Sequence, residues 1–140
     1  IEHGSDKDDE INLLKSGNFG WAPRVTYIEA GIPMTDLGRF PGANSAVWSS
    51  GSPTIAPSGG SFLKGKQWGT WNGSVAMAVL KGKQVRIMTF DANNILKDQK
   101  AVLTEFGRIR STVEGPDGGL YISTDNGSND KIIKVTPSGN

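Results

Sequence analysis

The chain has 140 residues, which is enough for one ordinary domain with a core of its own. Its 15 lysines and arginines nearly cancel its 14 aspartates and glutamates, so no strong net field favours nucleic acid or an anionic membrane surface as a partner. The lack of cysteine excludes disulfides and thiol catalysis, and no apolar run is long enough for a membrane span.

The content of glycine and proline indicates the fold class. The sequence contains 19 glycines, 7 prolines and 4 tryptophans. This composition favours many short strands joined by tight turns. The chain is therefore expected to be all-β.

The first segment, residues 1–23, carries the acidic run DKDDE at positions 6–10. Carboxylates of this kind bind calcium, but their spacing is not that of an EF-hand loop. A solvated acidic turn is the preferred interpretation, because acidic residues are mostly exposed. A short apolar strand is predicted to follow over residues 11–14.

The second segment, residues 24–58, is the least periodic part of the sequence. Four prolines and a run of glycine, serine and alanine interrupt it. Such a composition predicts a long loop, and long ordered loops are often functional. Trp48 either lines a pocket in this loop or pins the loop to the core, and the sequence does not choose between the two.

From Gly59 onward the pattern becomes a regular alternation of strands and turns. Lys81-Gly82-Lys83 predicts a tight hairpin, and Trp68 and Trp71 mark a corner between two strands. Besides those of the stretch 107–125, the predicted strands cover residues 61–63, 74–80, 84–90, 101–106 and 131–135.

The stretch 107–125, GRIRSTVEGPDGGLYISTD, predicts two strands joined by a glycine-rich turn. Arg108 and Arg110 are one residue apart in the first strand, so their side chains are expected on the same face of the sheet. Two fixed cations on one face suggest an anion site. The alternative is that they are solvated strand charges, since arginines are mostly exposed.

Strands at this spacing fit a β-propeller, whose blades each use about 40 to 45 residues. The chain is long enough for about three such blades, whereas known propellers close with about four to eight. We therefore expect one partial propeller domain over residues 1–140, about half of a six-bladed ring, with a long loop near residues 24–58. It would be completed by a missing N-terminal half or by a second copy in a homodimer.

Four motifs, taken together and in this order, carry a resemblance to a known family. The chain resembles the C-terminal part of the soluble quinoprotein glucose/sorbosone dehydrogenases, the PQQ-dependent aldose sugar dehydrogenases. The resemblance implies a six-bladed propeller that holds pyrroloquinoline quinone (PQQ), oxidises aldose sugars and works in the periplasm or as a secreted protein. The motifs are EHGSDKDDEINLLKSGNFGW, SPTIAPSG, AVLKGKQVRIM and GRIRSTVEGPDGGLYISTD.

The resemblance also implies which residues bind the cofactor. Lys81 matches the family lysine that contacts the quinone, and Arg108 and Arg110 match an arginine pair that binds it. Fixed cations suit a ligand that carries carboxylates and gains negative charge on reduction. Thr54 lies where the family loop approaches the quinone, but Ser52 stands where some members have a tryptophan that covers the ring.

A calcium site is implied at the start of the chain. Gly4 and Ser5 match the positions whose backbone carbonyls bind the ion, although the family usually has proline in place of Ser5. His3, the one histidine in the sequence, matches the residue before that glycine and is expected to be a partly buried imidazole at a strand end. The family's catalytic histidine precedes this region, so no catalytic residue is assigned here.

Two functions remain open from the sequence. One is the C-terminal portion of a PQQ- and calcium-dependent aldose dehydrogenase, which would be inactive without the catalytic base supplied by the earlier blades. The other is a non-enzymatic β-propeller module for binding or interaction, which keeps the scaffold without the base. PQQ and calcium binding would separate them.

Overall fold

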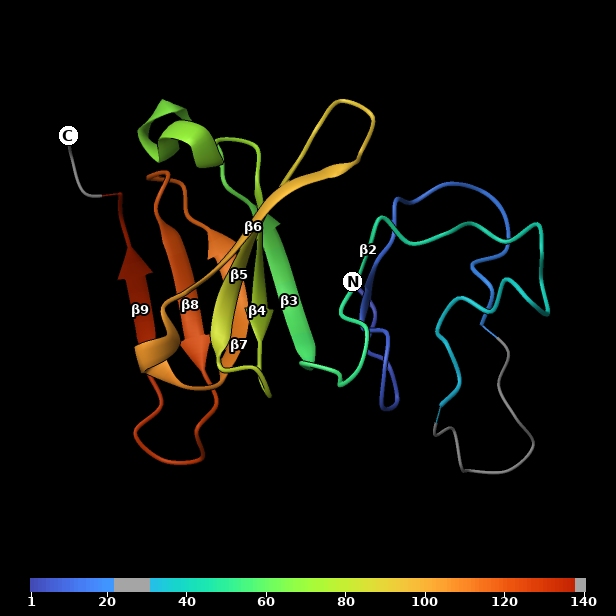
Figure 1. Ribbon diagram of the computed structural model, residues 1–140. Coiled ribbons are helices and arrows are strands. Elements are labelled where there is room, and N and C mark those ends of the chain that lie inside the picture. Colours follow the sequence, from blue (N-terminus) through green and yellow to red (C-terminus); the bar gives the residue numbers. More distant parts are fainter. Residues whose placement is uncertain (22–30, 138–140) are drawn as a thin grey trace. The chain divides into compact units, whose positions relative to one another are not determined.

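The computed structural model describes residues 1–21 and 31–137 (Figure 1). The chain divides into two compact units, residues 1–56 and residues 57–140. One continuous domain over residues 1–140 remains a prediction. No helix in the described part of the chain is long and apolar enough to cross a membrane.

The first unit is built mainly from ordered loops. Its two short strands, β1 (Glu10–Ile11) and β2 (Trp48–Ser49), pair antiparallel, with Ile11 opposite Trp48. Trp48 is only 8% exposed, which favours the interpretation that it pins the long loop to the core of this unit. Residues 24–30 of the predicted loop lie outside the described residues.

The apolar strand predicted over residues 11–14 is wrong. Strand β1 ends at Ile11, and Leu14 is 91% exposed. A run of apolar residues forms a strand only where a partner strand and a core are available to it, and β2 offers a partner for two residues only.

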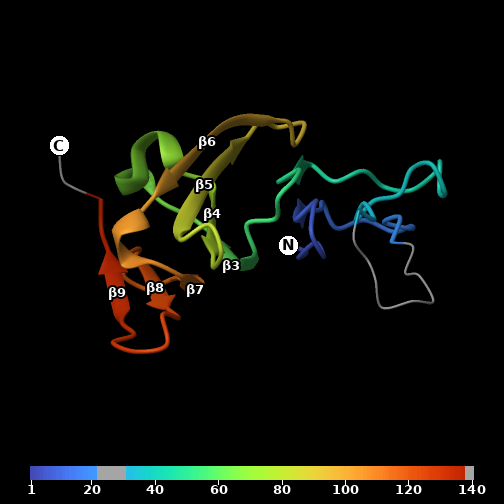
Figure 2. The ribbon, with the colours of Figure 1, turned by 60° about the horizontal axis from the view of Figure 1, so that its bottom comes forward.

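The second unit begins with a four-stranded antiparallel sheet in the order β3-β4-β5-β6. Consecutive strands lie side by side, as in a meander (Figures 1 and 2). The 3-10 helix η1 (Lys66–Trp71) joins β3 to β4 and buries Trp68 at the predicted corner. The strands are β3 (Pro57–Phe62), β4 (Val75–Val79), β5 (Gln84–Phe90) and β6 (Leu96–Val102).

The predictions for this sheet differ in accuracy. The hairpin at 81–83 and the strand at 84–90 are confirmed, because β4 and β5 pair antiparallel on either side of that turn and β5 spans Gln84–Phe90. The strand predicted over 101–106 is misplaced, since β6 starts at Leu96 and Thr104–Phe106 forms the 3-10 helix η2. Charged, exposed residues fill β6, so its sequence shows no apolar alternation.

The remaining sheet has three antiparallel strands in the order β7-β8-β9. They are β7 (Ile109–Glu114), β8 (Leu120–Thr124) and β9 (Ile132–Val135). The glycine-rich turn predicted between the first two is present, with Gly118 at a positive φ of 76°. The two strands predicted for the stretch 107–125 are therefore confirmed.

The core of the second unit lies between its two sheets. Small and branched residues of β4 and β5 pack against Ile109 of β7 and against Leu120 and Ile122 of β8. Two side chains also bond across the sheets: Thr112 donates to the carbonyl of Ala76, and Ser58 donates to the carbonyl of Ile109. These contacts place the end of β4 beside the start of β7.

Candidate functional site

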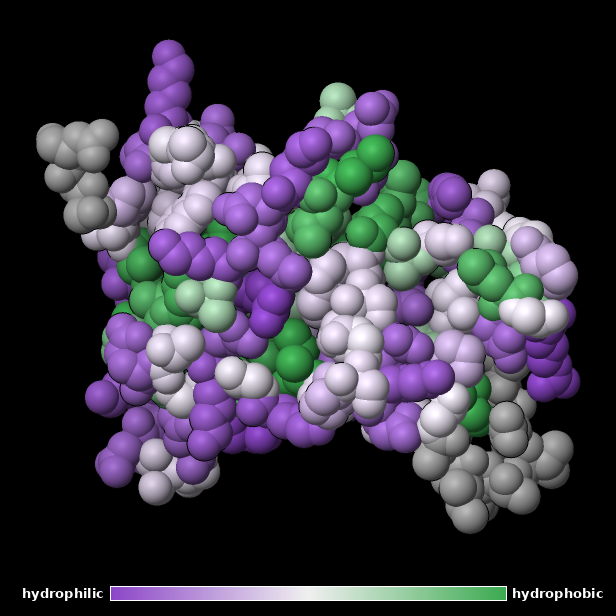
Figure 3. Space-filling view, viewed as in Figure 1, coloured by the Kyte–Doolittle hydropathy of each residue, from purple (hydrophilic) through white to green (hydrophobic). Residues whose placement is uncertain are grey.

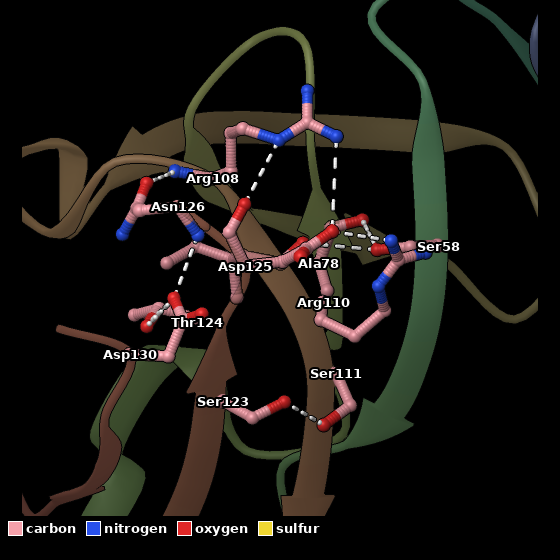
Figure 4. Close-up of polar contacts among 11 residues, drawn as sticks. Ser58, Ala78, Arg108, Arg110, Ser111, Ser123, Thr124, Asp125, Asn126 and Asp130 are labelled. Atoms are coloured by element: carbon pink, nitrogen blue, oxygen red, sulfur yellow. Dashed lines mark hydrogen bonds and ion pairs between the residues drawn. The ribbon is translucent and has the colours of Figure 1, made fainter. Parts of the chain in front are cut away.

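The predicted arginine pair lies where β7 begins. Arg108 directly precedes the strand, and Arg110 is its second residue. The register between β7 and β8 shifts between Ile109 and Ser111, which marks a bulge at Arg110. Bulges re-aim side chains. Here the two guanidinium groups converge on one carboxylate, as the prediction of a shared face required (Figure 4).

That carboxylate belongs to Asp125, the first residue after β8. The Nη2 atom of Arg110 donates to its Oδ2, and the Nη2 atom of Arg108 lies 3.7 Å from the same oxygen. The Nε atom of Arg108 also donates to the main-chain carbonyl of Asp125 at 3.0 Å. The side chains of Arg108, Arg110 and Asp125 are 41%, 54% and 36% exposed, so a ligand can reach the group. We call these three residues the arginine cluster.

The turn from β8 to β9 supports the arginine cluster. The side-chain amide of Asn126 accepts the N–H of Arg108 at 2.9 Å and donates to the carbonyl of Phe106 at 3.0 Å. Asp130 in turn accepts the N–H of Asn126 at 2.6 Å and the hydroxyl of Thr124 at 3.0 Å. Hydrogen bonds to this carboxylate lower its pKa, so Asp130 is ionised at neutral pH.

Gly107 shows how closely this turn approaches β7. Its φ is +77°, and a Cβ built on it would lie 2.4 Å from the Oδ1 atom of Asn126. Any larger residue would displace that amide, so glycine is required there. The backbone that carries Arg108 is therefore fixed before any ligand arrives.

Lys81 lies in the turn that joins β4 to β5. Because the end of β4 packs beside the start of β7, this turn and the arginine cluster are at the same end of the second unit, the lower end in Figure 1. The sequence-predicted cations of this unit are thus grouped at one end. Lys81 is exposed.

The first unit holds the predicted metal ligands and Thr54. Gly4 is buried, and its N–H donates to the Oδ1 atom of Asp9 at 2.9 Å. A Cβ on Gly4 would lie 1.9 Å from the carbonyl oxygen of Lys7, so the turn accepts only glycine. Ser5 is exposed.

Asp9 joins this turn to the Thr54 segment. Its side chain is 0% exposed, and its Oδ2 atom accepts the N–H groups of Ile55 at 2.5 Å and Ala56 at 3.0 Å. Thr54 itself is buried and donates its N–H to the carbonyl of Asp6 at 3.3 Å. The structure therefore brings Gly4 and the Thr54 segment together through one carboxylate.

The expected solvated acidic turn is wrong for two of its members. Asp9 and Glu10 are both buried, because distant backbone and side-chain groups bond to them. Burial raises the pKa of Glu10, against the hydrogen bonds from Thr35 and Asn12 that lower it.

His3 is more exposed than expected, at 52% of its side chain. Its Nδ1 atom lies 2.6 Å from the carbonyl oxygen of Gly4, so this nitrogen carries a proton and donates to that oxygen. Glu2 forms an isolated bridge with Glu10, which places His3 at a strand end as predicted.

The residues differ in how well they suit the two implied ligands. Two guanidinium groups share one carboxylate in the arginine cluster, which leaves an excess of positive charge for an anion such as PQQ. The turn at Gly4 offers backbone carbonyls, which are the hard oxygen donors that calcium prefers. Among the described residues, no group of three or more histidine, aspartate or glutamate side chains is placed to hold a metal.

Comparison with known proteins identifies the family. A family model described as Glucose / Sorbosone dehydrogenase matches residues 1–134. The chain belongs to this family. The resemblance seen in the sequence motifs is thereby confirmed.

Two curated relatives match nearly the whole chain. Aldose sugar dehydrogenase YliI of Escherichia coli (strain K12) is 33% identical over 143 residues, which cover 97% of this chain and 37% of the relative. The uncharacterized protein slr1608 of Synechocystis sp. is 31% identical, over 96% of this chain and 32% of its own length. The chain thus spans about a third of the curated relatives it matches.

Solved structures agree in fold. A glucose dehydrogenase is 30% identical with a TM-score of 0.80, over 99% of this chain and 40% of its own. The apo-form of the soluble aldose sugar dehydrogenase of Escherichia coli is 29% identical with a TM-score of 0.78, and the match covers 98% of this chain and 40% of that one. The PQQ-bound aldose sugar dehydrogenase of Streptomyces coelicolor is 26% identical with a TM-score of 0.66, and the match covers 95% of this chain and 37% of that one. The prediction of propeller blades that form part of a larger ring is confirmed.

The sequence patterns did not identify three residues that the structure places against the predicted site residues. Asp9 was hidden in an acidic run, and its partners lie 46 and 47 residues further along the chain. Asp125 and Asn126 belong to an Asp-Asn-Gly turn, which sequence patterns interpret only as a turn. The one available signal was their position, directly after a strand that pairs with the arginine strand.

Proposed function

We propose that the chain is the C-terminal portion of a PQQ- and calcium-dependent aldose sugar dehydrogenase. The observation that carries the proposal is the arginine cluster, in which Arg108 and Arg110 are held together at the start of β7. Membership of the family and the PQQ-bound relative support the choice of PQQ as the anion.

The roles of the cations follow from their charge and placement. Arg108 and Arg110 bind carboxylate groups of the quinone, since a planar guanidinium pairs with a carboxylate through two hydrogen bonds. Lys81, at the same end of the second unit, would supply a further positive charge to a bound quinone, which gains negative charge when it is reduced. When bound, PQQ supplies the acceptor for the two electrons removed from the sugar.

The residues of the first unit have two roles in this proposal. The carbonyl groups of Gly4 and Ser5 bind calcium, and Thr54 contacts the quinone. Asp9 fixes Gly4 and the Thr54 segment relative to each other. The catalytic base and the rest of the cofactor site come from earlier blades of the full-length protein, which acts on aldose sugars in the periplasm or after secretion.

The direct test is PQQ binding by the full-length protein, measured by calorimetry with calcium present. Arg108→Ala and Arg110→Ala should each weaken PQQ binding by about tenfold or more, since each removes a charge-assisted pair. Lys66→Ala, which removes an exposed cation of η1, is the matched control. PQQ-dependent dye reduction with aldoses should fall in parallel with the loss of binding.

Two results would count against the proposal. Absence of PQQ binding in the full-length protein would favour the non-enzymatic propeller module. PQQ binding that is unaffected by either arginine substitution would show that the cofactor does not use this cluster. Removal of calcium with a chelator should weaken PQQ binding if calcium is part of the cofactor site.

A further inference from the structure

We propose that Asp125 is a positioning residue, which holds the guanidinium groups of Arg108 and Arg110 in the orientation that receives the anionic cofactor. The inference rests on the proposed function, because it concerns the same arginine cluster. It adds a residue that bears the wrong charge to bind an anion and that acts through the two arginines.

The contacts show how Asp125 performs this role. Its main-chain carbonyl accepts from the Nε atom of Arg108, and its carboxylate accepts from the Nη2 atom of Arg110 (Figure 4). Its own N–H donates to the carbonyl of Arg108 at 2.9 Å, so Asp125 is tied to the strand that carries both arginines. One residue therefore restrains two long side chains.

The turn that follows makes Asp125 a rigid support. Asp130 accepts from the N–H of Asn126 and from the hydroxyl of Thr124, the two neighbours of Asp125 in sequence. The hydroxyl of Thr124 also accepts the N–H of Lys131 at 2.8 Å. The residue on each side of Asp125 is thus held by hydrogen bonds of the turn.

Two physical effects of Asp125 on anion binding have opposite signs. As a negative charge beside the site it repels an anion, so its removal would tighten binding. As a restraint it removes rotamer freedom from two arginines before the ligand arrives, so its removal would weaken binding. All three side chains are substantially exposed, which screens the charge effect. We therefore expect the restraint to dominate.

The inference is tested by whether substitution of Asp125 weakens or strengthens the binding of PQQ. PQQ binding by the full-length protein is measured for Asp125→Asn and Asp125→Ala. Asp125→Ala should weaken binding roughly three- to tenfold, the loss expected for releasing one or two flexible side chains. Asp125→Asn keeps a hydrogen-bond acceptor of the same shape and should fall between Asp125→Ala and the unchanged protein.

Asp117→Asn is the matched control. Asp117 also carries an ion pair, with Lys134, and its side chain is 39% exposed against 36% for Asp125. It lies in the turn between β7 and β8, at the opposite end of this sheet from the arginine cluster. Its substitution removes the same charge and should leave the affinity for PQQ unchanged.

A second measurement reports on the arginines directly. In nuclear magnetic resonance spectra, the Nη–H signals of Arg110, whose Nη2 atom bonds to the Asp125 carboxylate, should broaden or shift toward solvent-like values in Asp125→Ala, while the backbone signals of β7 and β8 keep their positions. A general loss of folding would move both sets of signals. This readout separates a positioning role from a merely structural one.

The outcomes distinguish this inference from the function on which it rests. Tighter or unchanged PQQ binding in Asp125→Ala would overturn the positioning role, even if Arg108→Ala and Arg110→Ala abolish binding. If the arginine substitutions have no effect, the proposed function fails, and the inference fails with it. Weaker binding in Asp125→Ala together with an unchanged Asp117→Asn would support both.

Discussion

The carboxylate of Asp9 connects three parts of the first unit at a single buried point. It accepts the N–H groups of Gly4, Ile55 and Ala56, while the N–H of Asp9 itself donates to the hydroxyl of Ser50 at 3.0 Å. A buried charge is tolerated only when its hydrogen-bonding capacity is used. These bonds therefore hold the unit together as well as satisfying the charge.

We predict that Asp9→Asn destabilises the first unit by about 1 to 3 kcal/mol, because an amide group replaces one acceptor oxygen with a donor and leaves backbone N–H groups buried without partners. Chemical denaturation would measure the loss, and hydrogen exchange of residues 1–21 and 31–56 would locate it. Asp8→Asn is the control, since the carboxylate of Asp8 accepts a solvent-exposed hydrogen bond from the hydroxyl of Ser49. Equal effects of the two substitutions would contradict the role of Asp9.

The turn at Gly4 leaves no room for a side chain. Gly4→Ala would place a methyl group 1.9 Å from the carbonyl oxygen of Lys7, so the backbone must move. We expect a loss of about 3 kcal/mol in the free energy of unfolding, at the upper end of ordinary overpacking. Gly42→Ala is the control, because nothing lies within 4 Å of the position that its methyl group would take. A tolerated Gly4→Ala would show that the turn is looser in solution than its geometry indicates.

Local patterns predicted some of these residues and missed others for a physical reason. Arg108 and Arg110 were predictable, since alternation along a strand is a local property. Asp9 was not, because its partners Ile55 and Ala56 are brought to it only by the folded unit. Nothing in an acidic run distinguishes a buried carboxylate from its solvated neighbours.

At the level of elements, the turn between β7 and β8 is closed by a small polar network. The Oδ2 atom of Asp117 lies 2.6 Å from the Nζ atom of Lys134 in β9 and accepts the hydroxyl of Tyr121 in β8 at 2.9 Å. Its Oδ1 atom accepts the N–H of Gly119 at 3.1 Å. The network ties the turn to the two strands that follow it.

These contacts predict how the turn responds to pH. The hydrogen bond from Lys134, followed by those from Gly119 and Tyr121, lowers the pKa of Asp117 from 3.8 to about 2. The contribution of the ionised Asp117 to the free energy of unfolding is therefore fully present above pH 3.8. It is lost as the pH falls through about 2. The same pair raises the pKa of Lys134, so its contribution is present below pH 10.5 and is lost as the pH rises through the higher folded value.

Comparison of the unchanged chain with Asp117→Asn tests this expectation. The difference in stability between them should be constant near neutral pH and should shrink as the pH falls below 3.8. Carboxyl resonances of Asp117 give the pKa directly. A value near 3.8 in the folded chain would mean that the ion pair with Lys134 does not form in solution.

Element boundaries show where sequence patterns succeed. Strand β5 was predicted at its observed bounds, because β-branched and other apolar residues recur along it and a tight turn directly precedes it. Strand β6 was predicted five residues too late, because it lies at the edge of its sheet and carries exposed charges. A hydrophilic band follows β6 in the space-filling view (Figure 3). Its formation depends on pairing with β5, which is not visible in its own sequence.

At the scale of the whole molecule, the chain covers about 40% of the solved relatives that share its fold. A partial propeller leaves strand edges that a complete ring would cover. Within the described residues, β6 is one of the two outer strands of the four-stranded sheet, and β9 is one of the two outer strands of the three-stranded sheet. They differ in character, because β6 is protected by charged side chains whereas Ile132 of β9 is 81% exposed.

We therefore predict that the isolated chain self-associates through β9. An exposed apolar residue on an unpaired edge favours pairing with another strand, and a second copy offers the same edge. Ile132→Lys should shift the population toward monomer in sedimentation or light-scattering measurements, because it places a charge on that edge. Ile95→Lys is the control, since Ile95 is 59% exposed but lies in the turn before β6. A chain that stays monomeric at all concentrations, or an Ile132→Lys variant that associates as before, would contradict this role of β9.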